Sequence, residues 1–326
     1  MRALALLSGG LDSSLAVKLI MDQGIKVTAL KFTSPFCRCD SGNKCHAASL
    51  ARKLGIELIV IPKGEEYIEI VRNPRFGRGS GMNPCIDCRI FMLKKAKEIA
   101  DRIGAKIIFT GEVVGQRPMS QRMETLRLIE REAGLEGKVL RPLSAKLLPV
   151  TEAESMRWVD RDRLLAISGR SRRQQISLAK SIALNEYPCP AGGCLLTAKE
   201  YSLRLGEFLQ KAPEKFTTRE AILLSIGRHF RIQGDKLIIG RFKEENLRLR
   251  TLRTCRDWII EPLDVPGPTA LFESADDASL RLAASFVSRY SDSKGRITRI
   301  KCEGKSIVEL EAGPADEKTI AEARIG

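Results

Sequence analysis

The sequence predicts an α/β protein in which a parallel sheet carries helices on both faces and is followed by a smaller α+β domain. Between residues 2 and 110, short apolar segments alternate with segments of helical apolar periodicity, a pattern typical of parallel strands joined by helices. The motifs that carry chemistry lie just after predicted strands or in the connections to the next helix, where α/β sheets bind ligands. After residue 213 short strands and helices alternate, which indicates a separate domain.

The first predicted strand, residues 2–7, is apolar and ends at a glycine-rich turn, and residues 13–23 then show a helical apolar pattern. The same order recurs along the chain. Strands are predicted at 25–32, 56–61 and 105–110, and helices at 47–54 and 90–103. Strands that alternate with helices pair in parallel, because each helix returns the chain to the same end of the sheet.

The rest of the chain divides into a basic helical segment and the second domain. Residues 151–184 show a helical pattern, and a proline- and glycine-rich break follows at 187–193. Further strands are predicted at 228–232, 236–239, 258–262, 297–302 and 306–311, and helices at 243–252 and 275–290. We therefore expect two domains, residues 1–200 and residues 214–326, for which a length of 326 residues is sufficient.

The composition is that of a globular and basic protein. Apolar residues make up 43% and charged residues 29% of the chain, which excludes a disordered or fibrous protein. The net charge is +15, and twelve of these excess positive charges fall in residues 1–200. Such a surface attracts polyanions, so RNA or DNA is the leading class of partner, although charge alone also fits a merely soluble basic protein.

The apolar and cysteine patterns indicate the compartment. No stretch approaches the roughly 18 apolar residues of a membrane span, and residues 1–7 lack the features of a signal peptide. We therefore expect a cytoplasmic protein without a membrane partner. The nine cysteines should then be reduced, and their grouping points to metal or sulfur chemistry rather than disulfides. With only two histidines, a His-rich zinc enzyme is disfavoured.

A glycine-rich loop follows the first predicted strand. Gly9 and Gly10 let the backbone approach a ligand closely, and the start of the next helix favours bound phosphate. Asp12 is a candidate for organising Mg²⁺ or the loop, and Ser13 and Ser14 offer hydroxyls to phosphate. An ordinary glycine turn with a capped helix gives a similar pattern, and the position after the first strand favours phosphate binding.

This loop resembles the signature of the PP-loop ATP pyrophosphatases, an adenine nucleotide alpha-hydrolase-like fold; the matching residues are Ser8-Gly9-Gly10-Leu11-Asp12-Ser13. Two further segments, residues 110–121 and 140–143, are similar to segments of tRNA 4-thiouridine synthetases. The resemblance implies ATP binding by Ser8, Gly9, Gly10, Asp12, Ser13, Ser14, Gly111 and Gln116. Arg117 could stabilise charge that develops on the α-phosphate, although a capped helix start with surface polar residues is the plainer interpretation.

Cys85 and Cys88 lie two residues apart at the start of the long predicted helix, where backbone amides and Arg89 should lower the pKa of both thiols. Residues 83–88 resemble the cysteine segment of 2-thiouridylases, and residues 193–196 resemble the second such segment. In iron-sulfur members of this superfamily three cysteines hold a [4Fe-4S] cluster and leave one iron open for sulfide. The resemblance implies Cys85, Cys88 and Cys194 as ligands, with Cys189 as an alternative or fourth ligand.

Two alternatives to the cluster stay open. Structural zinc would use the same four thiols, and a metal-free route would carry a persulfide on Cys88 or Cys194, with the other resolving it. A second metal site is conceivable around residues 37–46; its candidate ligands are Cys37, Cys39, Cys45 and His46. Cys255 and Cys302 are predicted to be buried apolar residues.

Basic residues in two regions are predicted to bind RNA. Residues 227–246 and 261–269 resemble the RNA-binding domain of NFACT proteins. Arg228, Arg231, Arg241 and Lys243 are expected to contact phosphates there, with Phe242 available to stack on a base. The basic segment before it contributes Arg157, Arg170, Arg172 and Arg173. A solvated basic face without RNA is the alternative.

The sequence therefore predicts an ATP-dependent RNA sulfurtransferase, with tRNA as the expected substrate. Asp12, Arg117, Cys88 and Cys194 would be its catalytic residues, and AMP and pyrophosphate would be released. The cofactors would be ATP, Mg²⁺ and a [4Fe-4S] cluster or zinc, and sulfur would come from sulfide or a cysteine desulfurase. A non-sulfur PP-loop ligase and an ATP-sensing RNA-binding factor are the alternatives. The oligomeric state is open, with a homodimer as one form.

Overall fold

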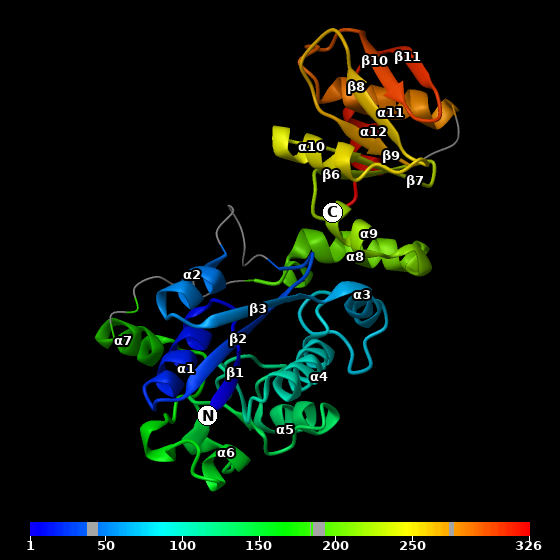
Figure 1. Cartoon of the computed structure of the whole chain (residues 1–326). Helices are drawn as coiled ribbons and strands as arrows, with labels where there is room; N and C mark the ends of the chain where they lie inside the picture. Colours follow the sequence, from blue (N-terminus) through cyan, green and yellow to red (C-terminus); the bar gives the residue numbers. More distant parts are fainter. Residues whose placement is uncertain (38–44, 183, 185–192, 274–276) are drawn as a thin grey trace. The chain divides into compact units, whose positions relative to one another are not determined.

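The chain forms two compact units, Met1–Thr197 and Ala198–Gly326 (Figure 1). The computed structural model describes residues 1–37, 45–182, 184, 193–273 and 277–326. The second unit starts well before residue 214, because helix α8 (Lys199–Lys211) belongs to it.

The first unit contains a five-stranded parallel sheet with the strand order β3-β2-β1-β4-β5. Its strands are β1 (Arg2–Leu6), β2 (Lys26–Thr33), β3 (Glu57–Pro62), β4 (Ile107–Thr110) and β5 (Val139–Leu140). Its helices are α1 (Leu11–Met21), α2 (His46–Lys53), α3 (Gly64–Arg72), α4 (Cys85–Ile103), α5 (Met123–Glu132), α6 (Glu152–Ser155) and α7 (Arg173–Ser181). This confirms the fold class predicted for the first part of the chain.

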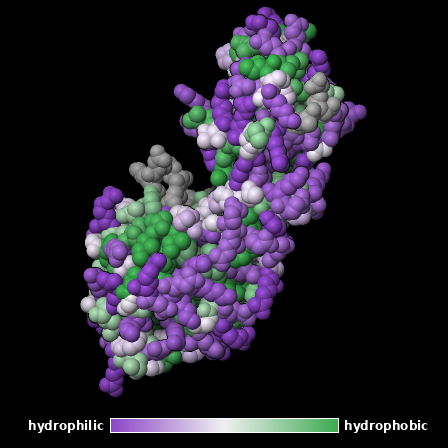
Figure 2. Space-filling model, turned by 45° about the vertical axis from the view of Figure 1, so that its right-hand side comes forward, coloured by the Kyte–Doolittle hydropathy of each residue, from purple (hydrophilic) through white to green (hydrophobic). Residues whose placement is uncertain are grey.

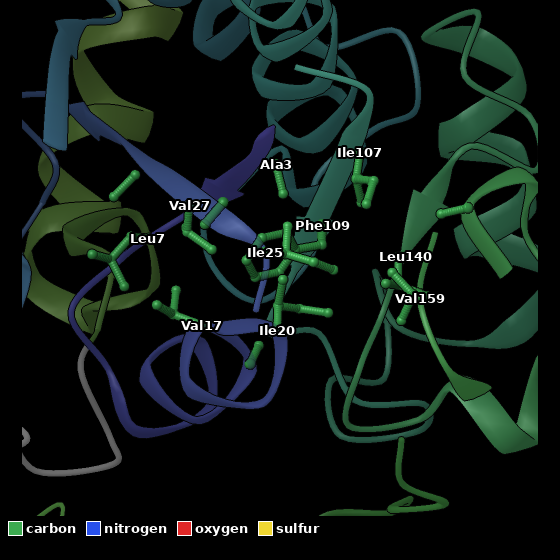
Figure 3. Close-up of a cluster of buried hydrophobic side chains, with 14 of the residues drawn as sticks. Ala3, Leu7, Val17, Ile20, Ile25, Val27, Ile107, Phe109, Leu140 and Val159 are labelled. Carbon is green, nitrogen blue, oxygen red and sulfur yellow. The ribbon is translucent and has the colours of Figure 1, made fainter. Parts of the chain in front are cut away.

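The central strands β1, β2 and β4 are buried on both faces of the sheet, to which their side chains point alternately. Ala3, Ala5 and Leu7 pack on one side with Val17 and Ile20 of α1, in the cluster drawn in Figure 3. On the other side, a second cluster joins β1, β2 and β4 to α4 and α5. The strands are almost continuously apolar in sequence because helices cover both faces of the sheet.

The strand order reverses at β1, which pairs with β2 on one side and with β4 on the other. Connections that leave β1 and β4 therefore diverge at the carboxyl ends of these strands, and this switch point is the expected ligand crevice of an α/β sheet. The glycine-rich loop at residues 8–10 and the segment that starts at Gly111 both lie at this point.

The second unit contains a six-stranded antiparallel sheet with the order β11-β10-β8-β9-β7-β6. The strands are β6 (Arg228–Ile232), β7 (Asp235–Ile239), β8 (Trp258–Pro262), β9 (Ala270–Phe272), β10 (Thr298–Glu303) and β11 (Ile307–Ala312). The helices besides α8 are α9 (Thr218–Leu223), α10 (Lys243–Thr251), α11 (Asp277–Arg289) and α12 (Glu317–Ala323). Separate apolar clusters join the sheet to α11 and to α9 and α10, so the expected α+β domain is confirmed.

The main error of the sequence analysis concerns residues 151–184. Among the described residues of this range, only α6 and α7 are α-helices. The stretch between them consists of turns, with a positive φ of 54° at Arg157, and a short 3-10 helix at Arg161–Arg163. Leu164 and Ile167 are buried as single anchors rather than as one face of a helix. The helices α3, α5, α8, α9 and α12 and the short strands β5 and β9 were not predicted.

The surface agrees with the composition. Within the described ranges, no helix is long and apolar enough to cross a membrane. The face in Figure 2 is mostly hydrophilic, with one larger hydrophobic area on the first unit.

Candidate functional site

The glycine-rich loop is shaped by contacts that only glycine permits. Gly9 has a φ of +81°, and a Cβ there would lie 2.7 Å from the backbone nitrogen of Ala47 at the start of α2. The hydroxyls of Ser13 and Ser14 donate to the carbonyl oxygen of Gly10 at 2.9 and 3.0 Å. In this arrangement the serines stabilise the loop, and a bound phosphate would compete for their protons.

A second glycine brings the end of β4 against the loop. A Cβ at Gly111 would lie 2.4 Å from the backbone nitrogen of Ser13 and 2.6 Å from the carbonyl carbon of Asp12. Any larger residue at Gly111 would push the β4 segment off the helix start. The two segments at the crevice are therefore in direct backbone contact.

Asp12 belongs to a chain of amide contacts that reaches α7. Gln116 Nε2 donates to Asp12 Oδ2 at 2.7 Å, and Gln175 Nε2 donates to Gln116 Oε1 at 3.1 Å. Arg172 lies 3.8 Å from the same Asp12 oxygen. Asp12 Oδ1 is buried and has no hydrogen-bond partner among the described residues. This oxygen is available to a ligand such as a hydrated Mg²⁺.

Glu112 links the crevice to the cysteine helix. Its carboxylate lies 3.3 Å from Arg89 Nε and accepts a hydrogen bond from Arg141 Nε at 3.2 Å. Thr110 Oγ1 donates to it at 3.1 Å. Burial raises the pKa of Glu112, but the charges of Arg89 and Arg141 outweigh it and hold the pKa below its ordinary value. Arg141 also pairs with Glu130, so the buried network contains two arginines and two carboxylates.

The first turn of α4 presents Cys85 and Cys88 to two side chains that follow β3. Lys63 Nζ donates to Cys88 Sγ at 3.0 Å and lies 4.0 Å from the centre of the Tyr67 ring. Tyr67 also forms a side-chain hydrogen bond with Cys88. The Cys88 sulfur therefore accepts hydrogen bonds from an ammonium and a phenol.

Cys194 joins this group through a short backbone bridge. Cys37 and Cys194 pair as an isolated antiparallel bridge, and the Leu195 amide donates to the Phe36 carbonyl at 2.8 Å. The Phe36 and Tyr67 rings are 5.9 Å apart, so this bridge lies beside the residues that surround Cys88.

The electrostatics separate the three thiols. Burial raises the pKa of Cys88, but Lys63, with help from Tyr67 and Arg89, outweighs it, so the pKa is lowered. Burial raises the pKa of Cys85 despite the charge of Arg89, and it raises the pKa of Cys194 to about 12. The prediction of a lowered pKa is therefore confirmed for Cys88 and wrong for Cys85, because desolvation exceeds the effect of Arg89 there.

The thiols fit a thiolate-bound cofactor in their chemistry, since soft sulfur ligands select zinc and iron-sulfur clusters and Lys63 and Arg89 would offset their negative charge. Within the part of the chain that the structure describes, no three His, Cys, Asp or Glu side chains form a group that could hold a metal ion. Cys189 lies outside the described residues. The ligand set therefore stays a prediction.

Three of the four candidate ligands of the suggested second metal site lie among the described residues. Cys37 is bridged to Cys194, whereas Cys45 Sγ accepts a hydrogen bond from Lys31 Nζ at 2.9 Å. His46 is the first residue of α2, and Cys39 lies outside the described residues. Among the other cysteines, Cys302 is buried as predicted, whereas Cys255 is exposed, because it lies in the turn after α10.

The basic residues expected to bind RNA have different surroundings. Arg157, Arg170 and Arg173 are exposed, whereas Arg172 lies at the glycine-rich loop beside Asp12. Burial lowers the pKa of the Arg117 guanidinium, and the nearby positive charges of Arg89 and Arg172 lower it further.

In the second unit, Lys243 and Phe242 are exposed, and Arg228 lies over the Tyr290 ring at 4.7 Å. Arg231 and Arg241 are ion-paired with Glu207 and Glu245. Both guanidinium groups are therefore engaged within the unit, and the predicted phosphate contacts would compete with these carboxylates. His229 is buried, and burial with nearby Lys236 lowers its pKa well below the ordinary value.

Lys63, Tyr67 and Gln175 belong to the site although they were not predicted, and the pairing of Cys37 with Cys194 was not predicted either. Lys63 directly follows β3, and Cys37 lies four residues after β2. The position of Lys63 and Cys37 after predicted strands was therefore a signal for both residues. Gln175 has no comparable signal, because its contact with Gln116 joins positions 59 residues apart.

Fold and site together define an α/β domain with a glycine-rich loop at the carboxyl ends of its strands and a nearby group of thiols, followed by an α+β domain. Residues 1–146 match the family model described as thiamine biosynthesis protein (ThiI), and residues 227–323 match that of the NFACT protein RNA binding domain. Both resemblances inferred from the sequence are confirmed. Each family model covers less than half of the chain.

Curated relatives match the first unit. A probable tRNA sulfurtransferase from Lysinibacillus sphaericus is 35% identical over 161 residues, which cover 48% of this chain and 38% of the relative. A tRNA-specific 2-thiouridylase MnmA from Syntrophotalea carbinolica is 34% identical over 119 residues, 33% of each chain. The chain thus spans about a third to two fifths of the length of these relatives.

Solved structures with similarity to the chain include a 4-thiouridine synthetase–RNA complex with bound ATP (22% identity, TM-score 0.37, 68% of this chain and 53% of that chain). The U34-tRNA thiolase NcsA from Methanococcus maripaludis with its [4Fe-4S] cluster has 14% identity and a TM-score of 0.35, covering 68% of this chain and 70% of that chain. These TM-scores are too low for individual residues to be equated.

Proposed function

We propose that this chain is an ATP-dependent RNA sulfurtransferase that replaces a uracil carbonyl oxygen of tRNA with sulfur. One observation carries the proposal: the dipeptide Gly111-Glu112 contacts the nucleotide loop through Gly111 and the cysteine helix through the Glu112–Arg89 pair. A base activated at the loop is thereby brought close to thiol chemistry. The matched relatives named tRNA sulfurtransferase and 2-thiouridylase support the same activity.

In the first half-reaction the uracil oxygen attacks the α-phosphate of ATP, and pyrophosphate leaves. The loop of Ser8, Gly9, Gly10, Ser13 and Ser14 would bind the leaving pyrophosphate, with Asp12 holding Mg²⁺ through its unpaired oxygen. Gln116 keeps the other Asp12 oxygen in place. Arg117 would stabilise negative charge on the α-phosphate, and Gly111 lets β4 pack against the backbone of Asp12 and Ser13 at the site.

In the second half-reaction sulfur displaces AMP from the activated base. Cys85, Cys88 and Cys194, with Cys189 as an alternative or fourth ligand, would hold a [4Fe-4S] cluster, and zinc on the same thiols is the alternative. When bound, the cluster would supply an open iron for sulfide. Lys63 and Arg89 would balance the negative charge of the thiolates. A persulfide on Cys88 or Cys194 is the route without metal.

The partners follow from the same chemistry. RNA, with tRNA as the expected class, would bind along exposed Arg157, Arg170 and Arg173 and along Arg228 and Lys243 of the second unit. Sulfur would come from sulfide or a cysteine desulfurase. A homodimer and a cytoplasmic location complete the proposal.

The decisive test is mass spectrometry of nucleosides from RNA of cells that lack this protein. The RNA is incubated with anaerobically purified full chain, MgATP and isotope-labelled sulfide, and we expect a labelled thionucleoside. If ATP is converted to AMP and no thionucleoside forms, a non-sulfur PP-loop ligase is the better assignment. If ATP binds and is not hydrolysed, an ATP-sensing RNA-binding factor is.

Two variants separate the half-reactions. Asp12→Ala should abolish AMP formation, whereas Cys194→Ala should abolish thiolation and leave RNA-dependent AMP formation in place. Asp22→Ala is the matched control for the first variant, because Asp22 lies at the far end of α1, pairs with Lys18 and is far along the helix from the loop. Full sulfur transfer by Cys194→Ala would contradict the cysteine assignment.

A further inference from the structure

Cys37 and Cys194 lie directly opposite each other in the antiparallel bridge that closes the thiol site. The hydrogen bond from the Leu195 amide to the Phe36 carbonyl joins the residues that flank this pair. The pair therefore occupies a non-hydrogen-bonded position, where opposed Cα atoms are typically about 4.5 Å apart. That separation lies within the range of about 4.4 to 6.8 Å that disulfides span.

The two thiols are also free to react with each other. Both are reduced and half-buried. Ser34 Oγ lies 3.2 Å from Cys37 Sγ, where its hydroxyl can donate to a thiolate. Cys88, the other thiol near Cys194, is already engaged by Lys63 and Tyr67. Cys37 is therefore the thiol that the backbone presents to Cys194.

We infer that Cys37 is the resolving thiol of the sulfur-transfer site: it closes a disulfide with Cys194 after a persulfide on Cys194 has delivered its sulfur. The inference rests on the proposed sulfurtransferase function in its persulfide form. It reassigns Cys37 from the suggested second metal site to the thiol site.

Two bond exchanges complete the transfer. The terminal sulfur of the Cys194 persulfide attacks the adenylated carbon of uracil, and AMP leaves with the electron pair of the broken C–O bond. The Cys37 thiol then loses its proton to solvent, and the resulting thiolate attacks Cys194 Sγ. The Cys37–Cys194 disulfide forms, the bond from Cys194 Sγ to the transferred sulfur breaks, and its electron pair stays on the base as a thiocarbonyl. An external protein persulfide supplies the sulfur, and an external dithiol reduces the disulfide.

Disulfide mapping tests the pairing without any RNA. The metal-free full chain is oxidised with diamide, and peptides are analysed by mass spectrometry without reduction. We expect a Cys37–Cys194 disulfide in the wild type, in Cys88→Ser and in the control Cys255→Ser, and its loss in Cys37→Ser. A disulfide from Cys194 to Cys39, Cys88 or Cys189, or a Cys194 that stays reduced, would overturn the inference.

A single turnover tests the role in catalysis. The metal-free chain is loaded with inorganic polysulfide, freed of excess reagent, and mixed with MgATP and RNA without reductant. The wild type and Cys255→Ser should form one Cys37–Cys194 disulfide per thionucleoside released, whereas Cys37→Ser should release about tenfold less and retain RNA bound to Cys194 through sulfur. Equal release by Cys37→Ser would overturn the inference. If the wild type shows the disulfide on diamide treatment and yet forms no thionucleoside, the pairing stands but its role in sulfur transfer is overturned, and the labelled-sulfide assay decides the proposed function separately.

Discussion

The two units carry their polar residues in opposite ways. In the first unit the segments after β1, β2, β3, β4 and β5 all leave the same edge of a parallel sheet. The glycine-rich loop, Cys37, Lys63, Glu112 and Arg141 therefore gather there. In the antiparallel sheet of the second unit successive strands end at alternate edges, and the basic residues are dispersed. Parallel pairing thus concentrates chemistry at one edge, whereas the second unit offers a surface for binding.

The largest effect is expected at Glu112, the buried carboxylate that links the segment after β4 to the cysteine helix α4. Glu112→Gln should lower the free energy of unfolding by about 3 kcal/mol at pH 7, because it leaves Arg89 and Arg141 without their shared charge partner. Urea unfolding measures the change. Exposed Glu124→Gln on α5 is the control and should leave stability nearly unchanged.

The same carboxylate predicts a pH dependence. The pKa of Glu112 is held below its ordinary value in the folded state, so its contribution is fully present above the unfolded pKa of about 4.3 and is lost as the pH falls through the folded pKa. The stability difference between wild type and Glu112→Gln should therefore shrink below about pH 4.3. A constant difference down to pH 2 would contradict the ionised, paired state.

A smaller effect is expected at the thiol that Lys63 contacts. In the metal-free protein Lys63→Met should raise the pKa of Cys88, because it removes the ammonium 3.0 Å from the sulfur. Alkylation of Cys88 by iodoacetamide at neutral pH should then slow by about tenfold. Lys94→Met, an exposed position on α4, serves as the control. An unchanged rate would show that Tyr67 and Arg89 suffice to hold the thiolate.

A smaller effect on ATP binding is expected when the hydrogen-bond chain from Gln175 on α7 through Gln116 to Asp12 is broken. Gln175→Ala should raise KM for ATP by about fivefold with little change in kcat, because one buried hydrogen bond that orients Gln116 and Asp12 is lost. Steady-state pyrophosphate release measures both constants. The neighbouring exposed Gln174→Ala should behave as wild type, and an equal effect there would indicate a general disturbance of α7.

The smallest effects are expected on the second unit. Lys243→Ala should weaken RNA binding by about two- to threefold and reduce its salt dependence by about one charge, because an exposed lysine can contact a single phosphate. Arg231→Ala should leave RNA affinity unchanged, since this guanidinium already pairs with Glu207. The reverse ranking, measured by titration at several salt concentrations, would show that RNA displaces the internal pair.

Much of the fold could be predicted because it depends on local periodicity. The alternating strands and helices of residues 2–110 and the strands at 228–232 and 258–262 all appear close to their expected bounds. The helical prediction for residues 151–184 was wrong for the stretch between α6 and α7. Buried residues such as Leu164 and Ile167 are three positions apart there, as in a helix, although each anchors a non-helical segment. The short strands β5 and β9 offer too few residues for a period to emerge.

The site shows the same division. The sequence alone determined the glycine loop, the position of Asp12 after the first strand and the two cysteines at the start of α4, since each depends on neighbouring residues. Only the tertiary structure decided that Lys63 contacts Cys88, that Gln175 reaches Gln116 and that Cys37 faces Cys194. It also decided which thiol has a lowered pKa, because that depends on burial and on charges from distant segments. Local sequence sets which groups are available, and the packing of strand ends sets which of them meet.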